Sequence, residues 1–186
     1  MAEPIYLSVR LPLKIGPLER GEYWEDPLSE ILEAEGIGEV TGGGTMMDPE
    51  GGILYCDLEV AMPDHSDAQL DKLQDAMMRL HAPRKTSFVD DDGATLREFG
   101  ETSVVGIGLN GADLPDAAYE GFDPDLFNDE IVAALGEGYS YGGSHAGERY
   151  TYFYYHGSDP DHIKAQLTTI AASKPIGEGA KIEQLA

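Results

Sequence analysis

The order of structural signals in the first half of the chain recurs in the second half, about one hundred residues later. Each copy contains an Asp-Pro pair that opens a helix, a glycine cluster, a strand, a second helix and a proline. In the first copy these are Asp26-Pro27, Gly42–Gly44, 53–61, the helix after Ser66 and Pro83; in the second they are Asp123-Pro124, Gly142-Gly143, 149–156, the helix after Asp159 and Pro175. A recurrence of this kind predicts two copies of one small folding unit.

The type of each element predicts how such a unit folds. Apolar residues alternate with other residues over 5–13, which is the period of a strand with one buried face. The complete order is strand, helix, strand, strand, helix, strand, which is that of a ferredoxin-like unit with two helices on one face of an antiparallel sheet. We therefore expect an α+β protein of tandem duplicated ferredoxin-like (βαββαβ) units, residues 1–93 and 94–186. Segment 94–101 should bridge to a strand at 102–110.

Alternation also assigns the side chains of strand 53–61 to the two faces of the first sheet. The set expected to face the helices is Leu54, Cys56, Leu58 and Val60. The set expected on the open face, together with residues of the first strand, is Ile53, Tyr55, Asp57, Glu59, Tyr6, Ser8 and Arg10. A surface ion pair explains the charges of this face without catalysis. Tyr55, Asp57 and Arg10 remain candidates for contact with a partner or ligand.

The matching strand of the second copy is rich in aromatic residues. Thr151, Phe153 and Tyr155 are expected to face the helices. The other set is expected to face outward beside Gly106 and Gly108, and consists of Tyr150, Tyr152, Tyr154 and His156. These rings either cover the bare backbone of the glycines or form an aromatic surface that a partner or ligand contacts. Both interpretations are open at the level of sequence.

The net charge restricts the class of partner. The 186 residues include 12 Lys and Arg against 35 Asp and Glu, and the resulting charge of −23 is spread over both halves. Such a field repels nucleic acid and anionic lipid, so we expect neither as a partner. It attracts basic proteins, although acidity also serves solubility or adaptation to salt. No stretch is long enough to span a bilayer and the first residues lack a secretion signal, so a cytoplasmic protein is expected.

Several motifs resemble sites of known chemistry but fail in their context. The glycines of 106–111 match a dinucleotide fingerprint, yet a polar turn rather than a helix follows them. The acidic turn 90–93 lacks both end ligands of a calcium loop. Cys56 is expected to be a buried thiol. No two of the five histidines have the spacing of helical metal ligands, so we predict no metal, cofactor or catalytic residue.

These observations favour a non-enzymatic acidic protein-binding module, such as an inhibitor or immunity-type partner of a basic protein. The alternative is a small-molecule-sensing regulatory domain with its ligand at the seam between the repeats. An enzyme that uses tyrosine, histidine and carboxylates is the third possibility. The oligomeric state is left open.

Overall fold

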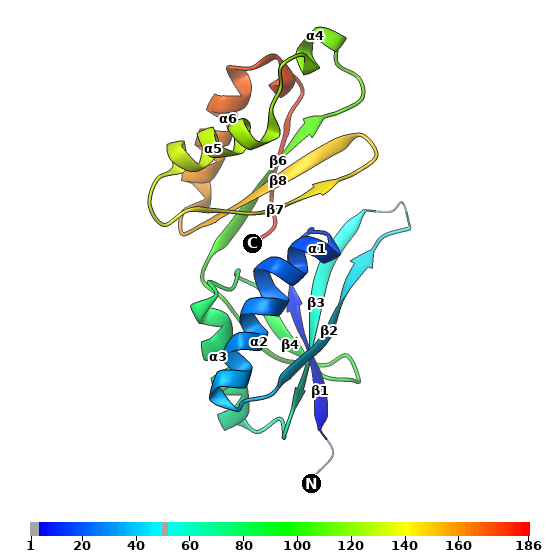
Figure 1. Ribbon diagram of the computed structural model, residues 1–186, viewed down its shortest axis with the longest axis vertical. Helices are drawn as coiled ribbons and strands as arrows, with labels where there is room; N and C mark the ends of the chain where they lie inside the picture. Colours follow the sequence, from blue (N-terminus) through cyan, green and yellow to red (C-terminus); the bar gives the residue numbers. More distant parts are fainter. Residues whose placement is uncertain (1–3, 50–51) are drawn as a thin grey trace. The chain divides into compact units, whose positions relative to one another are not determined.

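The computed structural model describes residues 4–49 and 52–186, and the chain divides into two compact units, Met1–Thr102 and Ser103–Ala186 (Figure 1). The fold is mixed α/β, with one antiparallel sheet and its helices in each unit.

Over its described residues, 4–49 and 52–102, the first unit has a five-stranded sheet. Its elements in order are β1 (Ile5–Leu11), α1 (Pro17–Arg20), the π-helical turn η1 (Gly21–Glu25), α2 (Asp26–Glu35), β2 (Glu39–Met47), β3 (Ile53–Met62), α3 (Asp67–Arg79), β4 (Thr86–Val89) and β5 (Thr95–Phe99). The strand order in the sheet is β2-β3-β1-β4-β5. The buried core combines alternate residues of β1 and β3 with the inner faces of α2 and α3.

The second unit has four strands. Its elements are β6 (Ser103–Asn110), α4 (Asp116–Tyr119), α5 (Pro124–Leu135), β7 (Ser140–Ala146), β8 (Tyr150–Gly157), α6 (Pro160–Ala172), the 3-10 turn η2 (Pro175–Gly177) and β9 (Lys181–Gln184). The strand order is β7-β8-β6-β9. Apolar residues of β6, β8, α5 and α6 form one buried cluster, and α5 and α6 lie on the same face of the sheet (Figure 1).

The start of the first helical segment differs from the prediction. We expected Asp26 to cap a helix, but Asp26 has helical backbone angles and lies inside a continuous helical stretch that begins at Pro17. Pro17 occupies the first turn, where the absence of a backbone N–H costs no hydrogen bond. The helix ends at Gly36, which has the left-handed φ of 62° that commonly terminates helices.

In the second unit the corresponding Asp-Pro pair does begin a helix. The Asp123 side chain accepts hydrogen bonds from the backbone N–H groups of Asp125 and Leu126. Phe122 packs edge-on against Phe127, with 5.5 Å between ring centroids, which is a hydrophobic staple across the start of the helix.

Segment 94–101 is not a bridge between the units. It contains β5, which pairs with β4 along Thr86–Val89 and extends the first sheet. The turn between the two strands is the acidic one, where Asp90 Oδ1 accepts from the backbone N–H groups of Asp92 and Ala94. The carboxylate thus closes a hairpin, and contacts divide the chain only after Thr102.

The face assignment for β3 is correct except at its first two residues. Cys56, Leu58 and Val60 are buried as expected, but Leu54 is 50% exposed and Ile53 is buried. The pairing of β2 with β3 shifts register here, because Met46 pairs with Tyr55 while the next residue, Met47, pairs with Ile53. The extra residue Leu54 interrupts the alternation, as a β-bulge does.

Candidate binding surfaces

Three tyrosines form a ladder on β8, on the face of the second sheet opposite the helices. The rings of Tyr150 and Tyr152 lie 6.3 Å apart, and those of Tyr152 and Tyr154 lie 6.1 Å apart and are stacked with an interplanar angle of 9°. The alternate residues Phe153 and Tyr155 belong to the helix-side core, as the alternation predicts. The sequence therefore identified the face on which each aromatic residue lies.

Two of the four residues on this face are buried, as the packing interpretation expects. Tyr154 is 0% exposed and His156 is 7% exposed, whereas Tyr150 and Tyr152 are half-buried. The Tyr154 hydroxyl donates a 2.8 Å hydrogen bond to Glu183 Oε1 on β9. Burial, together with the nearby Glu183 carboxylate, raises the pKa of the Tyr154 hydroxyl well above its ordinary range. Tyr154 is thus a neutral packing residue that fastens β8 to the last strand.

The glycines of β6 make room for these rings. A Cβ atom at Gly106 would lie 2.5 Å from a Tyr154 ring carbon, and one at Gly108 would lie 2.6 Å from a Tyr152 ring carbon. Gly106 and Gly108 pair directly with Tyr154 and Tyr152 in the antiparallel register. The rings therefore lie flat over bare backbone, which is the packing alternative considered for this strand.

His156 continues the same arrangement at the other edge of β8. Its imidazole lies against Gly142 of β7, where any Cβ would collide with the ring. Burial lowers the pKa of His156 to about 4, so the imidazole is neutral at physiological pH. It serves as packing for the β7–β8 hairpin, and Gly142 is the counterpart that accommodates it.

The exposed end of the ladder carries a cation. The Lys181 ammonium lies 4.1 Å from the centroid of the Tyr150 ring, within the range of a cation–π interaction. Tyr150 and Tyr152 are therefore the two ladder residues with ring surface that solvent reaches.

The three candidate residues of the first unit also come together. Arg10 Nε donates a 3.1 Å hydrogen bond to Asp57 Oδ1, and the guanidinium carbon lies 4.2 Å from the centroid of the Tyr55 ring. Arg10 and Asp57 are direct partners in the pairing of β1 with β3. This cluster belongs to the first unit and the β8 ladder to the second.

A buried polar network in the first unit was not predicted. The Arg20 guanidinium, whose side chain is 9% exposed, pairs with the Glu25 carboxylate and donates to Thr45 Oγ1 at 2.8 Å. A Cβ at Gly43 would meet both the Arg20 and Glu25 side chains, which explains one of the glycines of β2. The glycine cluster was the one sequence signal of this network. No local pattern of residues connected Gly43 with Arg20, which lies 23 residues earlier.

The cysteine of the chain is a buried thiol. Cys56 is buried, its thiol donates to the carbonyl oxygens of Leu13 and Ile15, and burial raises its pKa. Within residues 4–49 and 52–186, no three His, Cys, Asp or Glu side chains form a group that could hold a metal ion. Helices in the same described part are all too short or too polar to cross a bilayer.

Comparison with protein-family models and with curated proteins finds no match for this chain. Three solved structures align with nearly its whole length. They are an unknown protein from Galdieria sulphuraria (11% identity, TM-score 0.28, covering 98% of this chain and 96% of that one), a candidate monooxygenase from Lactobacillus acidophilus NCFM (13%, 0.32, 100% and 94%) and the gas vesicle protein GvpF from Anabaena sp. PCC7120 (10%, 0.31, 98% and 92%). Similarity this low carries no argument about activity.

Proposed function

We propose that this chain is a non-enzymatic, acidic protein-binding module that receives a basic protein, as an inhibitor or immunity-type partner does. The observation that carries the proposal is the same in both units. Half-buried tyrosines on the outer sheet faces already hold cations of the chain itself, Arg10 on Tyr55 and Lys181 on Tyr150. Ring faces that bind one guanidinium or ammonium group can bind another from a partner.

The charge of the chain supports the same class of partner. A net charge of −23 raises the association rate of a cationic protein, and salt screens that attraction over about 10 Å at 0.1 M. Tyrosine supplies contact area with few rotatable bonds, and aromatic residues often dominate binding energy. Among the ladder residues, Tyr150 and Tyr152 have accessible ring surface, so they are the proposed anchors; the buried Tyr154 supports them.

For the architecture, we propose that the two units are tandem copies of a ferredoxin-like unit. The strand orders β2-β3-β1-β4 and β7-β8-β6-β9 correspond position by position, and both follow the βαββαβ arrangement. On this proposal β5 is an addition to the first copy, and both copies have a short helical segment, α1 or α4, between the first strand and the first long helix.

The test begins with affinity capture at low and high salt, followed by calorimetry with the purified partner. Tyr152→Ala is expected to weaken binding by about 2 kcal/mol or more if Tyr152 is an anchor. Tyr150→Ala tests the neighbouring ring, and Tyr23→Ala serves as a control at a partly exposed tyrosine outside both clusters. Circular dichroism establishes that each variant is folded.

Unchanged affinity of both folded ladder variants would contradict the anchor assignment. Failure to capture any basic protein at low salt would contradict the proposed function itself. The second candidate function is the sensing of a small molecule, and a pocket within the second unit favours it. A ligand at the seam between the repeats stays a prediction.

A further inference from the structure

The second unit contains a pocket of about 300 Å³ between α4, α5 and η2. This volume is at the lower end of the range for sites that bind small organic molecules. The pocket lies on the helical side of the unit, away from the tyrosine ladder of β8, because its lining comes from residues 117–130 and 174–176. It is therefore a site distinct from the proposed protein-binding surface.

The inner wall of the pocket is apolar and fixed. Phe127 and Ile176 are buried members of the second unit's core, and Phe122 packs on Phe127 as the helix staple. Leu126 completes the wall from α5 and is 67% exposed. A large aliphatic side chain this exposed beside a pocket is surface that a ligand could remove from water, with a gain of about 25 cal/mol per Å² of apolar area.

The rim of the pocket is negatively charged. Glu120, Asp123 and Glu130 contribute three carboxylates, and Lys174 contributes the one basic side chain of the lining. Lys174 Nζ lies 2.7 Å from Glu130 Oε2, so it compensates one of the three charges. Asp123 Oδ1 already accepts two backbone N–H groups at the start of α5. Glu120 is therefore the carboxylate of the rim best placed to meet a ligand.

We propose that this pocket binds a small amphiphilic amine, an organic molecule with an apolar body and a cationic head. The body would lie between Leu126, Phe122 and Ile176, and the ammonium group would lie at the rim near Glu120. An anionic head would be repelled by the rim, and an uncharged head would forgo the ionic contact. The inference does not depend on the protein-binding proposal.

Three probes with one apolar body and different heads test the charge preference: 4-phenylbutylamine, 4-phenylbutanol and 4-phenylbutyrate. Each is titrated into the full chain, with amide chemical shifts followed by NMR. The amine is expected to bind about fivefold more tightly than the alcohol, which corresponds to one partly exposed ion pair of about 1 kcal/mol. The carboxylate is expected to bind most weakly. Equal affinity for all three probes, or no shift changes at residues 117–130, would overturn the proposal.

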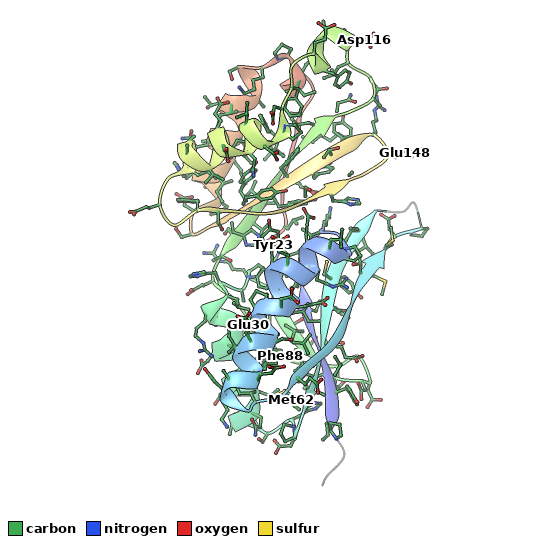
Figure 2. The ribbon with its side chains drawn as sticks, in the orientation of Figure 1. Tyr23, Glu30, Met62, Phe88, Asp116 and Glu148 are labelled. Carbon is green, nitrogen blue, oxygen red and sulfur yellow. The ribbon has the colours of Figure 1, made fainter. Side chains whose placement is uncertain are left out.

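Charge variants localise the ammonium group. Glu120→Gln is expected to weaken the amine severalfold and to leave the alcohol unchanged. Lys174→Gln releases Glu130 from its ion pair and is expected to strengthen the amine. Glu148→Gln is the matched control, since it removes the same charge from the exposed β7–β8 turn (Figure 2). If Glu148→Gln weakened the amine as much as Glu120→Gln, the effect would come from the overall field and the site assignment would be wrong.

The apolar wall is tested separately with Leu126→Ser. This exposed position tolerates the change, and the variant should weaken the amine and the alcohol by the same factor. Weakening of neither probe in the folded variant would place the ligand body elsewhere and would contradict the proposal.

Discussion

Strands β1 and β6 occupy the same position in their sheets, yet their outer faces differ. In β1, buried residues alternate with half-buried or exposed ones, whereas every residue of β6 is buried. The outer face of β1 carries Ser8 and Arg10, with the ion pair to Asp57. The outer face of β6 carries Gly106 and Gly108 beneath tyrosine rings of β8.

The difference shows that one strand order can support two kinds of surface. Side chains on the central strand keep the outer face polar and half-open in the first sheet. In the second sheet, glycine at alternate positions of β6 leaves room for rings of β8 to lie over the backbone, where the Tyr154 ring is buried and the Tyr152 ring is half-buried. Four experiments test this contrast.

The largest effect is expected from truncation of the buried ring. Tyr154→Ala should destabilise the protein by about 3–5 kcal/mol, as large aromatic truncations in cores do, while Tyr55→Ala should cost below about 1 kcal/mol. Urea unfolding followed by circular dichroism measures both. Two variants of β3 serve as references for a helix-facing and an outward-facing residue. Leu58→Ala should destabilise the protein by about 2–4 kcal/mol and Glu59→Ala by less than about 0.5 kcal/mol. Equal costs for Tyr154→Ala and Tyr55→Ala would mean that the two outer faces do not differ.

The buried imidazole of the second sheet predicts a pH dependence. His156 has a folded pKa of about 4 against an unfolded value of 6.5, so the unfolded chain takes up the proton first. The contribution of the neutral imidazole to the free energy of unfolding is complete above pH 6.5. On the order of 3 kcal/mol of stability is lost as the pH falls towards 4.

Carboxylates titrate in the same pH range, so the measured quantity is the stability difference between the wild type and His156→Gln. As the pH falls from 7 to 4, the free energy of unfolding of the wild type should decrease relative to that of His156→Gln. A difference that stays constant over that range would show that His156 is protonated normally in the folded protein.

A methyl group added beneath each ring tests the close approach of ring and backbone. Gly106→Ala should cost about 1–3 kcal/mol, because the fully buried Tyr154 ring has no room to move. Gly108→Ala should cost less, since the half-buried Tyr152 ring can swing outward. Thermal unfolding of the two variants gives the comparison, and the reverse order would indicate that Tyr152 rather than Tyr154 is the rigid member of the ladder.

The smallest effect is expected on the outer face of the first sheet. A double-mutant cycle with Arg10→Met and Asp57→Asn should give a coupling of about 0.2–1 kcal/mol, because both side chains reach solvent. The coupling should fall in high salt. A value well above this range would mean that the face is more enclosed than that of an open sheet.

Local signals in the sequence were sufficient for much of the fold. Period-two patterns found the central strands, and the Asp123-Pro124 pair marked the start of a helix, because these features depend on residues only a few positions apart. The sequence also placed Tyr150, Tyr152 and Tyr154 on one face of one strand. The spacing of these tyrosines was therefore sufficient to identify them as a candidate aromatic surface.

Only the tertiary structure decided which of these residues are accessible. Tyr154 is buried with a hydrogen bond to Glu183, which lies 29 residues away in the chain. The bulge at Leu54 arises from the pairing of β3 with β2. Each of these outcomes depends on contacts between segments that are distant in sequence, and no local pattern of residues records such contacts.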